Sequence, residues 1–423
     1  MGLKFRLVIM NFLQFAVWGA YLTCIGNFLG RIGLGEYIAW FYIAQGVVSI
    51  FMPSIMGTIA DKYIQPQCLL GIAHLLSSGF MLLTAVMGMQ GVGISIWAIF
   101  LPYCVSVAFY MPTIALANTV AFSALERYGF DKIKDFPPIR VFGTVGFIAA
   151  MWFVNFVKIG LTETAQFTYM QLIISAVLGI VLGLYCFTLP ECIIASNKKN
   201  SQKTLIQRLG LDAFVLFKQK KMAIFFLFSM LLGVSLQITN GFATPYINHF
   251  AAVGKSWFAQ NPTFLISVSQ ICEALCLLLI PFFLKRFGIK KVMLIAMFGW
   301  VLRFGFFGIG STESALGIVF LFLSCVVYGV AFDFFNVSGA LFVEQEASKP
   351  MQANAQGLFM LMTNGIGASV GTWIAGMIVN RYCSWSDQFL LGNWNMVWFI
   401  FASYALVVAV LFAALFKYKH ERK

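Results

Sequence analysis

The sequence predicts an all-α polytopic membrane protein with twelve transmembrane helices in two six-helix halves. The first observation is composition: 61% of the 423 residues are hydrophobic and 10% are charged, against about 45–50% and about 25% in soluble domains. This surplus cannot be buried in a soluble core, because too little polar surface would remain to face water. The second observation is the length of the apolar runs, which at about 20 residues suits helices that cross ~30 Å of hydrocarbon.

The continuity of these apolar runs predicts that the spanning segments are helices and not strands. Backbone groups in lipid must satisfy their hydrogen bonds internally, so only helices and closed barrels span a bilayer. Barrel strands alternate over segments of about ten residues, whereas residues 222–240 and 292–310 are almost continuously apolar. The run at residues 7–29 follows Lys4 and Arg6, but it is longer than the roughly 7–15 apolar residues of a signal peptide. We therefore expect it to be the first span.

Charges, prolines and glycines divide the apolar runs into two sets of six. The first set is expected at residues 7–29, 37–60, 68–89, 94–121, 139–157 and 168–189. The second set is expected at residues 222–247, 263–284, 292–310, 315–342, 355–380 and 395–416. A basic segment separates them, so we expect an N-terminal half at residues 1–189, a cytoplasmic linker at 190–221 and a C-terminal half at 222–423. Such a layout is typical of transporters built from parallel repeats.

The basic residues predict the orientation, because cytoplasmic loops are enriched in lysine and arginine. If the N-terminus is cytoplasmic, most of the 28 basic residues fall on the cytoplasmic side. The opposite side holds only Arg31, Lys158, Lys255 and Arg381. We therefore expect both termini in the cytoplasm. Inside-facing loops then account for the net charge of +13, so the charge does not indicate a nucleic-acid partner.

Three ionisable residues fall deep inside expected spans: Glu273, Asp333 and Arg303. A charged side chain at the membrane centre costs at least ~2.5–3.5 kcal/mol, so such residues usually face an internal cavity. Arg303 could be a counter-ion for either acid or have a coupling role. His74 and His249 lie near the ends of expected spans, where a place at the membrane interface is favoured over a proton relay.

Polar and aromatic residues accompany these charges at helical spacings. The groups are Arg140, Thr144 and Phe147; Gln237 and Asn240; Ser269, Gln270 and Glu273; and Tyr328, Phe332 and Asp333. Amides and carboxylates accept hydrogen bonds from hydroxyl groups, and aromatic faces stack on flat rings. A small, hydroxyl-rich ligand with a flat ring fits this set. Single residues such as Thr144, Thr244 or Asn336 could instead join helices by hydrogen bonds.

Several stretches of the chain resemble a known family. They are residues 135–144, 228–240 and 328–336, with 11–19, 355–357 and 416–420 in support. They resemble the NupG-type nucleoside permeases, the nucleoside:proton symporters of the major facilitator superfamily. The charged loops at 57–63 and 284–291 resemble the paired loops of that superfamily. The resemblance implies the major facilitator fold, and it implies a nucleoside site lined by Arg140, Thr144, Phe147, Gln237, Asn240, Gln270, Glu273, Tyr328, Phe332 and Asp333.

The expected function is proton-coupled import of nucleosides by alternating access, by a monomer in the bacterial inner membrane. The sequence contains no G-x-x-x-x-G-K-[ST] phosphate loop, so the driving force must be an ion gradient. Neither a catalytic set nor a metal-ligand spacing is present, so no enzyme, cofactor or metal is expected. A channel is disfavoured by the two-half layout. A sugar symporter or a drug exporter of the same superfamily is the alternative.

The two buried acids are expected to divide the work. Asp333 is flanked by Phe332, Phe334 and Phe335, and apolar neighbours disfavour the ionised form of a carboxyl group. Glu273 shares a helical face with polar residues that can keep it charged. We therefore expect Asp333 to carry the coupled proton and Glu273 chiefly to hold the ligand.

Overall fold

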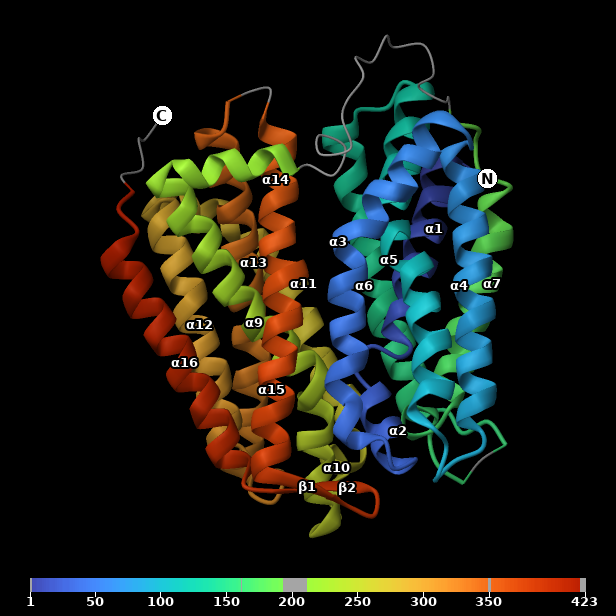
Figure 1. Cartoon of the computed structure of the whole chain (residues 1–423), viewed down its shortest axis with the longest axis vertical. Coiled ribbons are helices and arrows are strands. Elements are labelled where there is room, and N and C mark those ends of the chain that lie inside the picture. The colour runs from blue at the N-terminus through green and yellow to red at the C-terminus, as the bar shows by residue number, and fades with distance from the viewer. Residues whose placement is uncertain (1, 161, 193–210, 349–350, 419–423) are drawn as a thin grey trace. The chain divides into compact units, whose positions relative to one another are not determined.

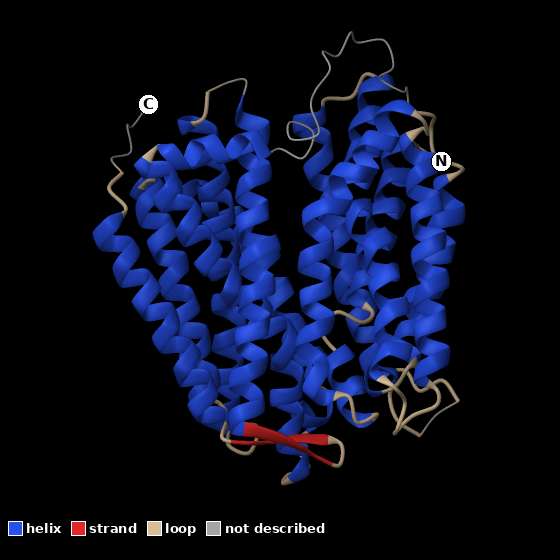
Figure 2. Ribbon diagram, in the orientation of Figure 1, coloured by secondary structure: helices blue, strands red, loops and turns tan. Residues whose placement is uncertain are grey.

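The computed structural model describes residues 2–160, 162–192, 211–348 and 351–418, and these are mostly helical (Figures 1 and 2). The chain divides into two compact units, Met1–Lys203 and Thr204–Lys423. The predicted linker at 190–221 falls at this division, and its residues 193–210 lie outside the described residues. Each unit is a helical bundle with its own core.

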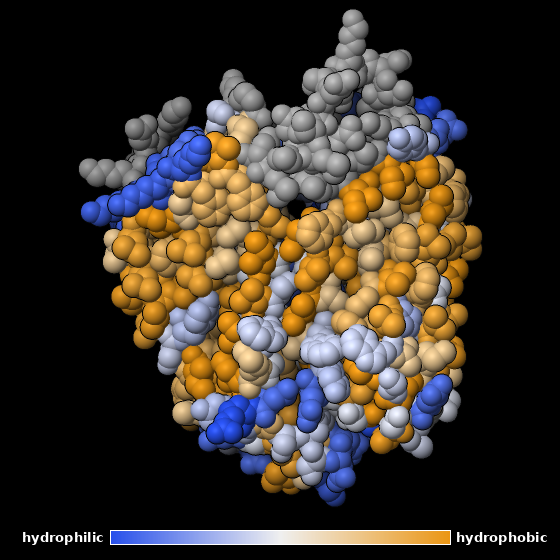
Figure 3. All heavy atoms as spheres, in the orientation of Figure 1, coloured by the Kyte–Doolittle hydropathy of each residue, from blue (hydrophilic) through white to orange (hydrophobic). Residues whose placement is uncertain are grey.

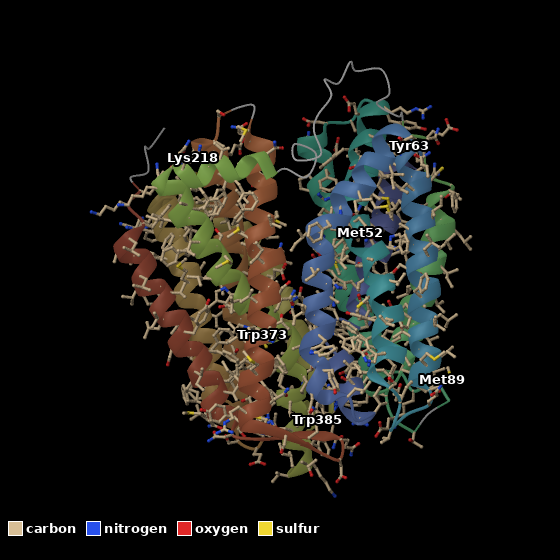
Figure 4. All side chains as sticks on the ribbon, in the orientation of Figure 1. Met52, Tyr63, Met89, Lys218, Trp373 and Trp385 are labelled. Atoms are coloured by element: carbon tan, nitrogen blue, oxygen red, sulfur yellow. The ribbon has the colours of Figure 1, made fainter. Side chains whose placement is uncertain are left out.

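The N-terminal unit contains seven α-helices within the described residues, joined by short turns. They are α1 (Leu3–Gly19), α2 (Ile25–Arg31), α3 (Ile38–Lys62), α4 (Pro66–Gly88), α5 (Ile96–Arg127), α6 (Lys132–Phe156) and α7 (Met170–Cys186), with 3₁₀ turns η1 (Gly35–Tyr37) and η2 (Ala165–Phe167). Tyr63 and Met89, just beyond the ends of α3 and α4, lie at opposite ends of this bundle (Figure 4).

The C-terminal unit holds the remaining elements. They are η3 (Leu211–Lys218), α9 (Lys220–His249), η4 (Phe250–Ala252), α10 (Trp257–Gln260), α11 (Pro262–Phe287), α12 (Ile289–Ile309), α13 (Ala315–Glu346), α14 (Gln352–Met360), the π-helical turn η6 (Leu361–Gly367), α15 (Ala368–Tyr382), β1 (Cys383–Ser386), β2 (Phe389–Gly392) and α16 (Trp394–Leu415). The strands form an antiparallel hairpin in which Cys383 pairs with Gly392. The sequence predicted only a loop there.

Ten helical segments of the described chain are long and apolar enough to cross a membrane. The expected span at 168–189 is the shorter helix α7, with 17 residues. The expected continuous span at 7–29 is wrong, because turns at residues 20–24 separate α1 from α2. The Tyr42 hydroxyl donates to the Leu22 carbonyl in this break. An interrupted transmembrane helix is tolerated when other groups of the protein form hydrogen bonds with the backbone groups that the interruption leaves unpaired.

Hydrophobic residues cover the middle of each bundle, and hydrophilic residues gather towards its ends (Figure 3). Large apolar side chains stand exposed along the long helices; Leu278 and Leu316 are examples. A water-soluble protein rarely exposes so large an apolar surface. The chain is therefore a multi-pass membrane protein.

Glycines allow the helices to approach at backbone distance. In the N-terminal unit, a Cβ on Gly146 of α6 would collide with the Phe12 backbone of α1. In the C-terminal unit, a Cβ on Gly329 of α13 would lie 2.6 Å from the Cys272 carbonyl oxygen of α11. Small residues at crossings of this kind are characteristic of membrane helices. These contacts fix α6 against α1 and α13 against α11, the helices that carry most of the predicted site.

The predicted interfacial position of His74 is wrong, because its side chain is fully buried within α4. His74 Nε2 lies 2.7 Å from Gln14 Oε1, and Gln14 Nε2 donates to Thr113 Oγ1 at 2.8 Å. The Tyr110 hydroxyl donates to the Gln14 carbonyl oxygen at 2.7 Å. Gln14 on α1 thus provides a partner for the buried Nε2, and Thr113 and Tyr110 on α5 hold Gln14 in place. His249 is half-buried at the end of α9, near a span end as expected.

Candidate functional site

The two carboxyl groups of the C-terminal unit come from neighbouring helices. At the crossing of α11 and α13, a Cβ on Gly329 would lie 2.8 Å from Glu273 Cα. Asp333 follows Gly329 by one helical turn, and the two carboxyl groups interact electrostatically. Asp333 is 5% exposed, and its Oδ2 has no hydrogen-bond partner in the described part of the chain. Burying a charged, unpaired carboxylate is costly, and protonation removes that cost.

Aromatic rings lie beside this acidic pair. The rings of Tyr328 and Phe332 are parallel, with centroids 5.8 Å apart and an interplanar angle of 5°. Trp300 of α12 meets the Tyr328 ring edge-on at 5.9 Å. Gln270 of α11 lies near the Tyr328 hydroxyl. The cluster therefore combines acids, an amide and flat apolar surfaces, as a ligand with a ring and hydroxyl groups requires.

Arg303 is fully buried on α12 behind the Tyr328 ring. Its Nη1 donates to Ser269 Oγ at 3.2 Å and to the Ser324 carbonyl oxygen at 2.9 Å. The guanidinium carbon lies 4.4 Å from the Tyr328 ring centroid, within the range of a cation–π contact. These partners are uncharged, which favours a structural role that joins α11, α12 and α13 over a counter-ion role.

The amide pair lies on α9. Asn240 Nδ2 donates to Gln237 Oε1 at 3.0 Å, and both side chains are half-buried. The bond leaves the Gln237 N–H groups as donors. Leu236 precedes Gln237 and lines a cavity together with Phe332 of α13.

The three predicted residues of the N-terminal unit share one face of α6. The Arg140 guanidinium carbon lies 3.9 Å from the Phe15 ring centroid of α1. Phe147 is buried and meets the Trp18 ring at 6.2 Å, edge-on. Thr144 is half-buried between them along the helix. One face of α6 therefore carries a guanidinium group, a hydroxyl group and an aromatic ring.

In the C-terminal unit, the structure brings Gln270, Glu273, Tyr328, Phe332 and Asp333 together, whereas Gln237 and Asn240 contact each other on α9. Sequence reasoning did not include Trp18 or Trp300 among the candidate site residues. Trp300 lies three residues before Arg303, and this helical spacing was the available signal. Among the described residues, no group of three histidine, cysteine, aspartate or glutamate side chains could hold a metal ion.

The sequence pattern of the family described as Nucleoside H+ symporter matches residues 1–421. The chain belongs to the nucleoside–proton symporter family. Among its relatives, the xanthosine permease of Escherichia coli K12 is 44% identical, with 100% of this chain and 97% of the permease covered. The nucleoside permease NupG of the same organism is 42% identical, with 100% and 98% covered.

Solved structures agree with this family. The crystal structure of nucleoside transporter NupG matches with a TM-score of 0.88 and 41% identity, over 99% of this chain and 100% of that chain. A bacterial homologue of the human lysosomal transporter Spinster matches with a TM-score of 0.70 at 12% identity, over 98% and 96%. At this identity the second match shows the fold alone. The two proteins share a helical architecture.

Proposed function

We propose that this family member imports nucleosides together with protons across the cytoplasmic membrane. The observation that carries the proposal is the cluster on α11 and α13, where the buried Asp333 lies near Glu273 and beside the Tyr328–Phe332 ring stack. A group that can take up a proton thereby adjoins surfaces that can hold a base and a ribose. The relatives named as permeases for xanthosine and nucleosides support the same substrate class.

The proposed mechanism is alternating access. The residues proposed to contact the nucleoside are Arg140, Thr144, Phe147, Gln237, Asn240, Gln270, Glu273, Tyr328, Phe332 and Asp333. Asp333 takes the coupled proton, because its carboxyl group is the more buried of the two and is costly to keep charged. Glu273 is half-buried and holds ligand hydroxyl groups as acceptor. Proton uptake by Asp333 then allows the nucleoside-bound protein to change from the outward-open to the inward-open conformation.

The proposed architecture has twelve spans in the major facilitator fold. Its halves are residues 1–189 and 222–423, joined by the cytoplasmic linker 190–221, with both termini in the cytoplasm. The broken segment α1–α2, the shorter α7 and ten longer segments supply these twelve spans. The protein acts as a monomer and has no enzymatic activity or cofactor.

Uptake into proteoliposomes tests the function. An inward proton gradient should drive accumulation of radiolabelled uridine above its outside concentration, and a protonophore should abolish it. Labelled glucose tests the sugar-symporter alternative and should not accumulate. A cationic dye tests the drug-exporter alternative and should not be expelled. Accumulation driven by a sodium gradient alone would contradict proton coupling. Transport of glucose without uridine would contradict the substrate class.

A further inference from the structure

Trp18 of α1 lies against Phe147, the aromatic residue that α6 contributes to the proposed nucleoside site. The two rings meet edge to face, with centroids 6.2 Å apart and an interplanar angle of 89°. Trp18 is half-buried, and Phe147 is 7% exposed. Edge-to-face pairs at this distance stabilise each other beyond the area that they bury. The orientation of the Phe147 ring therefore depends on where the Trp18 indole lies.

The backbones beneath this ring pair are also in contact. Gly19 follows Trp18, and a Cβ on Gly19 would collide with the Phe147 carbonyl oxygen and lie 2.8 Å from the Phe147 Cα. Helices α1 and α6 therefore meet backbone to backbone at this point, as small residues allow in membrane helices. Because this contact fixes the main chain of Phe147, its ring can change place only by rotation about its side-chain bonds.

Two further helices fix the Trp18 indole. Its N–H donates to Gln45 Oε1 of α3 at 3.3 Å, and Gln45 Nε2 donates in turn to the Tyr103 hydroxyl of α5 at 2.6 Å. Gln45 is 2% exposed, so this chain of hydrogen bonds lies inside the bundle. The Tyr110 ring of α5 lies 6.1 Å from the Trp18 ring and is inclined to it by 48°. The hydrogen bond and the two neighbouring rings hold the indole in one orientation.

The second ring against Trp18 is itself anchored. The Tyr110 hydroxyl donates to the Gln14 carbonyl oxygen at 2.7 Å, and the Tyr110 ring meets the His74 ring of α4 at 5.9 Å and 72°. Contacts from α1, α3, α4 and α5 thus converge on one indole, which lies against one candidate site residue. A binding group is most effective when surrounding contacts lock its rotamer in this way.

We infer that Trp18 is a positioning residue for nucleoside binding: it orients the Phe147 ring, and Gln45 orients Trp18 through the indole N–H. The inference rests on the proposed function, because Phe147 is among the residues proposed to contact the nucleoside, and it deepens that function. Without the indole, the Phe147 ring gains other rotamers, and the nucleoside must select one of them on binding. Affinity then falls because the site is less preorganised.

A double-mutant cycle between Trp18 and Phe147 tests this role. Calorimetry measures uridine affinity for the unaltered protein, Trp18→Ala, Phe147→Ala and the double variant. Trp18→Ala should weaken binding by about two- to tenfold, the effect of one aromatic pair. In the Phe147→Ala background the same change should have no further effect, because the ring that Trp18 orients is absent. A general structural loss, or direct contact between Trp18 and the ligand, would instead add to the effect of Phe147→Ala.

Two milder variants isolate the hydrogen bond. Trp18→Phe keeps a ring against Phe147 and loses the N–H donor, whereas Gln45→Leu keeps the indole and loses its acceptor. Each should weaken uridine binding by about two- to tenfold, and the two changes combined should be no worse than either alone. Trp152→Phe is the matched control, because Trp152 is a 39% exposed tryptophan on α6; its uridine affinity should be unchanged.

Folding is checked for every variant by size-exclusion chromatography and thermal unfolding. Trp18→Phe takes the place of Trp18→Ala in the cycle if the alanine variant does not fold.

The outcomes separate this inference from the proposed function. Failure of the unaltered protein to bind any nucleoside overturns the proposed function and the inference with it. Normal uridine binding by Phe147→Ala, normal binding by Trp18→Ala, or additive losses in the double variant overturn the inference while the proposed function stands. A loss in Trp18→Ala that vanishes in the Phe147→Ala background, with a similar loss in Gln45→Leu, supports the inference.

Discussion

Replacing Gly329 with alanine perturbs the point where α11 and α13 cross. The added Cβ would lie 2.6 Å from the Cys272 carbonyl oxygen and 2.8 Å from Glu273 Cα, about 1 Å inside ordinary van der Waals separation. Both neighbours are backbone atoms, so no side-chain rotation relieves the overlap. The helices must move apart, and Glu273 moves away from Asp333.

The magnitude follows from two opposing terms. Overpacking of a well-packed site costs about 1–3 kcal/mol, and replacing glycine with alanine inside a helix gains about 0.8–1.0 kcal/mol. A net loss of up to about 2 kcal/mol remains. If the strain falls entirely on the bound state, uridine affinity decreases by up to about 30-fold, since 1.4 kcal/mol is tenfold.

The assay is calorimetric titration of uridine together with thermal unfolding in detergent. Gly305→Ala is the matched control: Gly305 lies on α12, and a Cβ there meets nothing within 4 Å. The control should bind uridine normally and unfold at the same or a higher temperature. Gly329→Ala should bind more weakly and unfold earlier. If the two variants behave alike, the close crossing does not position the acidic pair.

Three further substitutions test other contacts. Gln237→Ala should weaken uridine binding by about five- to 150-fold in calorimetry, because it leaves a ligand group unpaired; normal binding would reassign the amide pair to helix packing. Asp333→Asn should keep binding and counterflow but lose uphill accumulation, whereas Glu273→Gln should weaken binding itself; the opposite pattern would reverse their roles. His74→Ala should lower stability by about 1–3 kcal/mol, because Gln14 Oε1 loses its partner; an unchanged unfolding temperature would refute this.

The long apolar helices could be predicted from sequence because lipid exposure requires continuous hydrophobic runs. The starts of α9, α11 and α13 differ from the expected span starts by no more than two residues. The breaks could not be predicted in the same way. The turns between α1 and α2 and the π-helical turn η6 depend on tertiary contacts, such as the Tyr42 hydroxyl at the Leu22 carbonyl and the α9 backbone against Gly367.

The candidate site could be predicted where an ionisable residue falls inside an apolar span, because such residues are rare in membrane interiors. Glu273, Asp333 and Arg303 stand out in apolar runs, and helical spacing links the first two to their polar neighbours. His74 was misplaced, because its partners Gln14 and Thr113 lie on other helices and no local pattern reveals them.

Proton movement measured directly during nucleoside uptake tests the central claim. Proteoliposomes with a trapped pH-sensitive dye and no imposed pH gradient receive uridine outside, with potassium and valinomycin present to dissipate membrane potential. Uridine should acidify the lumen in liposomes with the unaltered protein, and glucose should not. Asp333→Asn liposomes should take up uridine to equilibrium without acidification. Uridine uptake by the unaltered protein without a lumenal pH change, or acidification by Asp333→Asn equal to that of the unaltered protein, would contradict the assignment of Asp333 as the proton carrier.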